Sequence, residues 1–248
     1  MVNLARHLSE KGAWCLRFDY MGQGDSQGNF EDSTIETMLS DIITAANLLR
    51  SYAGENAQLG FLGLRFGATL ATLAASRMAS IKLLILVAPI AQGKPYIETC
   101  LRSNLAAQMT LHGKVLKDRK ALVQDLMSDQ AVNIDGYLLT KTLYLEMLQL
   151  DLFAAPETIP RHVLIVHVAR SQGKPIPREI LTLQSACRHR GAEAECLDIA
   201  EEPFWTDTRV YIPRAKSLEQ AIVTWLERHL VPMKDEPLPS ATTEPAPR

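Results

Sequence analysis

The stretch "LGFLGLRFGATLATLAAS", residues 59–76, decides the fold that this sequence predicts. A short apolar run meets Gly63, a second glycine follows at Gly67, and a helix of small residues begins. This pattern is typical of a sharp strand-to-helix turn with Arg65 at its apex. The spacing is that of the nucleophile elbow, G-x-S-x-G, but arginine stands where the serine would be.

Such a turn forces its apex residue into a strained backbone conformation, so the residues around it must lack bulk. We expect Gly63 and Gly67 to meet that requirement. The apex side chain should project from the carboxyl edge of a sheet, at the positive end of the following helix. The backbone N–H of Phe66 depends on the turn alone, and we expect it to stay available as a donor to an anion.

Strand-like and helical segments alternate along most of the chain. We predict strands within 14–20, 57–63, 81–89, 161–169 and 192–200, and helices that include one capped by Ser33 or Thr34 and others over 177–190 and 215–230. The fold class is therefore α/β, a mainly parallel sheet flanked by helices. Residues 96–157 show a helical pattern without a clear strand, and we interpret them as an inserted helical cap. The cap would separate two parts of the core, 1–95 and 158–230. We expect the proline-rich tail, 231–248, to be disordered.

Composition excludes several function classes. Apolar residues make up 47% of the 248, and the formal net charge is −2, so we expect no nucleic acid partner. The sequence has no apolar run long enough to span a bilayer and no signal-peptide pattern, which predicts a cytoplasmic location without a membrane span. The four cysteines form no metal-ligand spacing, so we expect neither a metal nor a cofactor, and Cys15 and Cys196 should be small buried hydrophobes.

Two further stretches extend the pattern around the elbow. "FDYMGQGDSQGNF" (18–30) is a glycine-rich turn after a strand, and "ILVAP" (85–89) ends the next buried strand. With the elbow, these stretches make residues 1–230 resemble the α/β-hydrolase superfamily. A closer resemblance is to the exosortase A system-associated hydrolase (type 2) group, through "GQGDSQGNFEDSTIETML" (22–39), "GLRFGATLA" (63–71) and "EEPFWT" (201–206). That resemblance implies a bacterial hydrolase of the serine aminopeptidase-like type, linked to PEP-CTERM sorting and exopolysaccharide.

The resemblance implies a Ser-His-Asp triad, and this sequence does not supply one. A guanidinium stays protonated and has no lone pair for attack, so Arg65 is not a nucleophile. The loop where the superfamily places the acid, residues 169–175, has no Asp or Glu, and the loop where it places the histidine, residues 200–213, has no His. His167 lies within a strand pattern and is better explained as a satisfied core imidazole. We therefore assign no catalytic residue.

The superfamily also has a strand between the segments that correspond here to 14–20 and 57–63, and its neighbouring loop gives the second oxyanion donor. Because this sequence starts within the following helix, we expect the first strands to be missing and the second donor to be absent. The two segments then either close up against each other or leave backbone groups unpaired. An internal start codon or a fragment would explain this, and the DNA upstream of Met1 tests it.

Three interpretations of Arg65 stay open: binding of a carboxylate or phosphate, a structural plug paired with a carboxylate such as Asp19 or Asp25, or drift after loss of activity. In the glycine-rich turn, Asp19 and Ser26 are better explained by turn hydrogen bonds than by catalysis. Trp205 could form an aromatic wall of the pocket or pack an edge.

The main hypothesis is a hydrolase-like protein without serine-hydrolase turnover that binds a small acyl or anionic ligand between core and cap. The rival is an active ester, thioester or peptide hydrolase whose nucleophile lies outside the elbow. An interaction protein that uses the cap surface is a third possibility, although no motif identifies its partner.

Overall fold

A computed structural model describes residues 1–154, 158–171, 173, 175–206 and 215–230. Its main sheet has the order β1 (Leu59–Leu64), β2 (Ile81–Val87), β5 (His162–Ala169) and β6 (Glu193–Ala200). All three neighbouring pairs are parallel. The predicted α/β class and four of the five predicted strands are confirmed.

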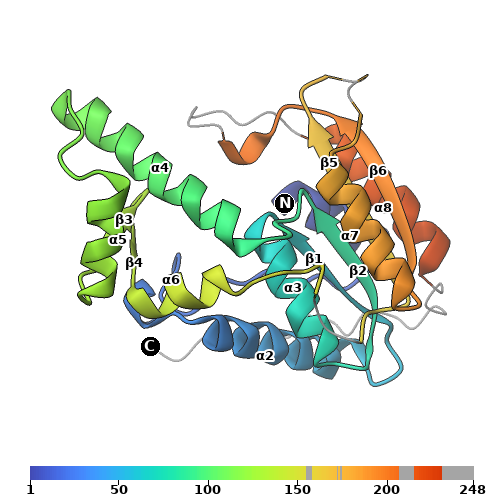
Figure 1. The fold of residues 1–248 in the computed structure, drawn as a ribbon. Coiled ribbons are helices and arrows are strands. Elements are labelled where there is room, and N and C mark those ends of the chain that lie inside the picture. Colours follow the sequence, from blue (N-terminus) through green and yellow to red (C-terminus); the bar gives the residue numbers. More distant parts are fainter. Residues whose placement is uncertain (155–157, 172, 174, 207–214, 231–248) are drawn as a thin grey trace.

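Helices cover both faces of this sheet (Figure 1). On one face, α3 (Phe66–Ser76) and α7 (Arg178–His189) pack against the strands in one apolar cluster. On the other face, α1 (Val2–Glu10) and α8 (Lys216–His229) form a second cluster. The continuous apolar sequences of β2 and β5 follow from this, since both strands are buried on their two sides.

The long helix α2 (Ile35–Ala53) begins where the sequence predicted. Thr34 is its cap: its side chain accepts a hydrogen bond from the Thr37 N–H, and Thr37 accepts one from the Thr34 N–H. A short 3₁₀ turn, η1 (Phe30–Asp32), precedes it. This helix packs on α3 and joins the core to the segment that follows β2.

Between β2 and β5 the chain leaves the sheet and builds a separate layer, drawn from green to yellow at the left of Figure 1. It contains α4 (Gly93–His112), α5 (Arg119–Met127) and α6 (Lys141–Leu148). The prediction of a cap without strands is wrong, because β3 (Val132–Ile134) and β4 (Tyr137–Leu139) form an antiparallel hairpin.

The hairpin turn explains that error. Its two central residues, Asp135 and Gly136, have φ values of 50° and 98°. Two positive φ angles are what a two-residue hairpin turn needs, and Asp-Gly supplies them well. The strands on either side of this turn have three residues each and lie between two helices, so the helical pattern around them dominates the sequence.

The predicted strand over 14–20 is also wrong. These residues have no regular secondary structure and pair with no described strand, and positions 15–19 are exposed, including Leu16 and Phe18 at 40% each. The sequence left two outcomes for this segment and β1: either they pair with each other, or their facing backbone groups stay unpaired. The structure shows the second outcome. Because positions 15–19 are exposed, water can hydrogen-bond the backbone groups of this segment. Cys15 is exposed too, which corrects its predicted burial, while Cys196 is partly buried.

Among the described residues, no helix combines the length and the apolar composition that a membrane span requires. The division of the chain at about residues 95 and 158 stays a prediction. The tail expected to be disordered, 231–248, lies outside the described residues.

Candidate functional site at the strand-to-helix turn

The turn between β1 and α3 has the strained geometry that its sequence predicts. Arg65 has φ 55° and ψ −121°, a conformation that non-glycine residues seldom adopt. Its N–H donates to the carbonyl of Val87 on β2 at 2.9 Å, which fixes the turn to the neighbouring strand. Ala88, directly after β2, also has a positive φ, 45°. Two strained residues therefore lie side by side at the carboxyl edge of the sheet.

The two glycines of the elbow have different roles. A Cβ on Gly63 would lie 2.3 Å from the Gly67 carbonyl oxygen and 2.5 Å from the Ala68 backbone, so no side chain fits there. A Cβ on Gly67 would meet no atom within 4 Å. The prediction that both glycines make room for the turn is confirmed for Gly63 and wrong for Gly67. The helix approaches the strand at Gly63 and leaves open space at Gly67.

The Arg65 side chain lies among core and aromatic groups. Its guanidinium donates to the Ala88 carbonyl at 3.4 Å and lies 5.7 Å from the centre of the Trp205 ring. Trp205 belongs to the 3₁₀ turn η2 (Phe204–Thr206) that follows β6. Phe66, the first residue of α3, stacks on Tyr96 of α4 with ring centres 5.7 Å apart. The guanidinium thus has one aromatic neighbour, Trp205, and the next residue along the chain, Phe66, belongs to a second aromatic pair.

Burial decides the protonation of the groups that α4 brings to Arg65. It raises the pKa of Tyr96 to about 12, although the nearby guanidinium of Arg65 opposes the rise. Burial likewise raises the pKa of the Cys100 thiol. At neutral pH both groups are therefore protonated, and Cys100 is a poor nucleophile because the reactive form of a thiol is the thiolate.

The plug interpretation fails for the residues named for it. In the part of the chain that the structure describes, Arg65 forms no ion pair, and neither Asp19 nor Asp25 reaches it. Asp19 instead accepts from the Asp25 N–H at 3.5 Å, and the Ser26 hydroxyl donates to the Asp19 carbonyl at 2.7 Å. The structure therefore favours the predicted turn role of Asp19 and Ser26.

A histidine–carboxylate pair occurs elsewhere on the sheet. His167 on β5 and Asp198 on β6 are cross-strand partners, and His167 Nδ1 lies 2.7 Å from Asp198 Oδ1. Their side chains are 18% and 29% exposed. The predicted satisfied imidazole is confirmed, and its partner is Asp198. No described Ser, Thr or Cys hydrogen-bonds to the other ring nitrogen, so the pair has no nucleophile in contact.

Sequence reasoning missed Ala88, Tyr96 and Asp198 as members of these two clusters. Tyr96 and Ala88 could have been found by noting that the segment after β2 must start above the elbow, because the strands are neighbours. Asp198 could have been found because it and His167 are polar positions in two adjacent apolar strands. Among the described residues, no group of three or more His, Cys, Asp or Glu could hold a metal ion.

A family model described as "Serine aminopeptidase, S33" matches residues 1–153. Because the match covers more than half of the chain, the protein belongs to this family. No curated protein sequence matches the chain.

Solved structures show the same fold at low sequence identity. The ferulic acid-bound Est1E from Butyrivibrio proteoclasticus is 21% identical at a TM-score of 0.59, covering 92% of this chain and 81% of its own. The α/β hydrolase GrgF from Penicillium sp. sh18 is 19% identical, with a TM-score of 0.57 and coverages of 92% and 84%. The enol-lactonase from Burkholderia xenovorans LB400 is 17% identical, with a TM-score of 0.52 and coverages of 84% and 79%. The fold is therefore that of the α/β hydrolases.

The unequal space at the two elbow glycines gives the first prediction. Gly63→Ala should lower the free energy of unfolding by about 2–3 kcal/mol, because its methyl group would overlap backbone atoms. Gly67→Ala is the matched control and should be neutral or stabilise by about 0.4–1 kcal/mol, through a less flexible unfolded chain. Urea denaturation measures both; equal losses would contradict the described turn.

Proposed function

We propose that this member of the serine aminopeptidase S33 family binds a small acyl or anionic ligand, with its carboxylate or equivalent anion at Arg65, and lacks serine-hydrolase turnover. One observation carries the proposal. A permanently charged guanidinium stands at the strained apex of the turn, and no described carboxylate neutralises it.

The donors around the turn support an anionic ligand. The guanidinium carries five N–H donors, and the Ala88 carbonyl takes one of them at 3.4 Å. Phe66 and Gly67 open α3, an 11-residue helix, and the first N–H groups of a helix have no partner within it. A carboxylate beside Arg65 would meet both sets of donors. Trp205, Phe66 and Tyr96 would contact the apolar part of such a ligand.

The absence of turnover follows from the groups at the apex. Attack on an ester needs an oxygen or sulfur that can lose its proton to a neighbouring base. Arg65 cannot supply it, and the thiol of Cys100 is held protonated by burial. The Phe66 N–H could still stabilise an oxyanion, but one such donor without a nucleophile does not start the reaction.

Binding of carboxylates tests the proposal. Isothermal titration with butyrate and with ferulate should show binding that Arg65→Ala weakens by roughly tenfold to a hundredfold, the range for a hydrogen bond to a charged group. Arg65→Lys should retain part of the affinity, because it keeps the charge but loses the paired donors. Arg77→Ala is the control, since Arg77 is an exposed arginine paired with Glu36. Equal affinities for the Arg65→Ala and Arg77→Ala variants would refute the assignment.

Reactivity tests the second half of the proposal. The full chain should neither react covalently with a fluorophosphonate nor hydrolyse short p-nitrophenyl esters. Arg65→Ser should also stay inactive, because a serine at the apex has no histidine to deprotonate it among the described residues. Mass spectrometry of the labelled protein and the absorbance of released p-nitrophenolate measure these outcomes. Covalent labelling of the unaltered chain would defeat the proposal.

The rival function, a hydrolase whose nucleophile lies outside the elbow, has one observation in its favour. The pair of His167 and Asp198 has the arrangement of a base and its orienting acid. If the unaltered chain hydrolyses p-nitrophenyl esters and His167→Ala abolishes the activity, the rival function holds. If His167→Ala has no effect, the pair is structural.

We further propose that the protein acts in the cytoplasm of bacteria with an exosortase A system. Two of the three motifs shared with that group meet in space, since Arg65 of 63–71 lies over Trp205 of 201–206. The third, 22–39, contacts the cap, where Glu146 accepts from the Ile35 N–H at 2.7 Å.

The proposed cellular role has a direct test. Deleting the gene in its host should lower the amount of exopolysaccharide, measured as carbohydrate recovered from the culture. The unaltered gene should restore it and a copy encoding Arg65→Ala should not. Unchanged exopolysaccharide in the deletion strain would remove this role.

A further inference from the structure

Where α4 ends and the chain turns into α5, every residue from 109 to 120 is exposed. These residues form the α4–α5 corner, the outer end of the layer that follows β2, at the upper left of Figure 1. Four of the side chains are apolar: Met109, Leu111, Val115 and Leu116 are 52%, 77%, 41% and 56% exposed. Single exposed apolar side chains are ordinary, but four within one short turn indicate a binding surface.

Hydrogen bonds hold the α4–α5 corner in one shape. The Gln108 side chain accepts from the N–H groups of Leu116 and Lys117 at 2.7 and 2.9 Å, and it donates to the Lys117 carbonyl at 2.9 Å. The carboxylate of Asp118 then caps the first turn of α5. The chain is thus fixed directly at Leu116, so the exposure of this side chain is a property of the fold.

The α4–α5 corner is basic in a chain that is acidic overall. It contains one acidic residue and four basic ones, Lys114, Lys117, Arg119 and Lys120. Its formal charge of +3 leaves −5 for the rest of the chain, because the whole carries −2. Lys117 pairs with Asp125 and Arg119 with Glu98. Lys114 and Lys120 form no ion pair with any described residue, so their charges are available to an anionic partner.

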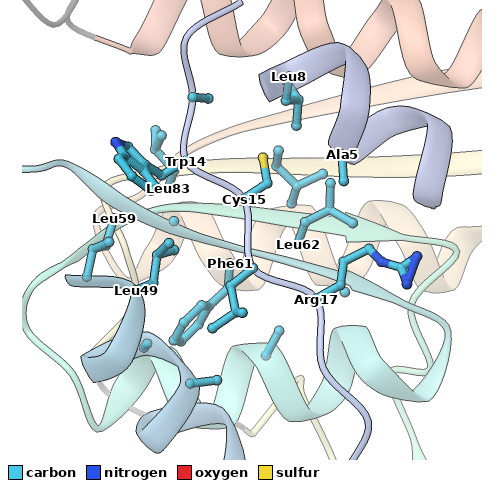
Figure 2. Close-up of a pocket in the computed structure, with 18 of the residues that line it drawn as sticks. Ala5, Leu8, Trp14, Cys15, Arg17, Leu49, Leu59, Phe61, Leu62 and Leu83 are labelled. Atoms are coloured by element: carbon cyan, nitrogen blue, oxygen red, sulfur yellow. The ribbon is translucent and has the colours of Figure 1, made fainter. Parts of the chain in front are cut away.

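Its shape separates the α4–α5 corner from the apolar cavity in the core. That cavity, of about 690 Å³, is lined from several sides by residues that include Leu49, Phe61 and Leu62 (Figure 2). No residue of the corner lines it. Because the corner is the outer end of a layer, its apolar side chains would have to enter the partner. A bilayer surface admits such side chains, and its anionic lipids attract lysine.

We infer that the α4–α5 corner binds the surface of a bilayer that contains anionic phospholipid. Leu111, Val115 and Leu116 lie among the acyl chains next to the headgroups in this arrangement, and Lys114 and Lys120 contact the lipid phosphates. The aliphatic stems of the lysines allow both contacts at once, because they keep the ammonium groups at the level of the headgroups. The inference does not rest on the ligand proposed for the strand-to-helix turn.

Co-sedimentation of the full chain with vesicles tests the inference. Vesicles of equal parts dioleoylphosphatidylglycerol and dioleoylphosphatidylcholine should bind the chain at least roughly tenfold more tightly than dioleoylphosphatidylcholine alone. Lys114→Gln/Lys120→Gln should weaken this binding by about 25-fold, at about fivefold for each lysine. Leu111→Ser/Leu116→Ser should weaken it by at least roughly tenfold, because less apolar surface enters the bilayer.

Two matched controls remove the same groups from elements of the core. Lys82→Gln/Lys216→Gln changes the net charge by the same amount at two exposed lysines. Leu48→Ser/Leu181→Ser removes two leucines that are 49% and 44% exposed on α2 and α7. Each control should change the vesicle affinity by less than about twofold, since these sites lie outside the contact and salt screens distant charges.

Insertion of the corner has its own readout. Leu116→Trp adds an indole at the corner to the three tryptophans of the chain. On the mixed vesicles, the additional emission should shift to shorter wavelength. It should also be quenched when a dibrominated phosphatidylcholine replaces the ordinary one. The unaltered chain gives the reference spectrum.

Four outcomes would overturn the inference. The first is no sedimentation with the mixed vesicles, and the second is an equal loss of binding in the corner variants and their controls. The third is vesicle binding without quenching of the added tryptophan. The fourth is a solution partner: a dimer, seen by light scattering, that Leu111→Ser/Leu116→Ser dissociates would assign the corner to a second copy. An affinity for soluble polyglutamate equal to that for the vesicles would assign it to an acidic protein.

Discussion

The backbone turn at Arg65 is the constraint on which the rest of the structure depends. Its positive φ is tolerated because the Val87 carbonyl holds its N–H and because Gly63 lets α3 pass close to the strand. The turn places the first N–H groups of α3 and the side chain of residue 65 at one point on the sheet edge. The turn has the strained geometry of a nucleophile elbow, and Arg65 places a fixed positive charge at its apex.

Burial and charge together determine what this edge can do. The layer after β2 brings Tyr96 and Cys100 to the turn, and burial keeps both groups protonated. Trp205 covers the guanidinium from the other end of the sequence. In the proposed function, the guanidinium beside the Trp205 ring attracts an anion with an apolar body and supplies no nucleophile. These features are the grounds for the proposed binding without turnover.

Much of this fold could be predicted from local pattern. Apolar runs predict the buried strands β2 and β5, the capping residue Thr34 predicts the start of α2, and the glycine spacing predicts the elbow. Each of these signals acts within a few residues. The predictions failed where contacts between residues distant in the sequence determine the structure. Residues 14–20 have the composition of a strand, yet a strand needs a neighbour, and β1 pairs only on its other edge among the described residues. The contacts of Arg65 with Trp205 and of His167 with Asp198 join distant positions, and no local pattern gives them.

The position of an anion at the turn tests the central claim most directly. A crystal structure of the full chain grown with sodium butyrate would locate it. The account predicts one carboxylate within hydrogen-bond distance of both the Arg65 guanidinium and the Phe66 N–H, with its alkyl chain against Trp205. An Arg65 side chain bonded to a carboxylate of the protein itself, with no butyrate beside it, would contradict the account.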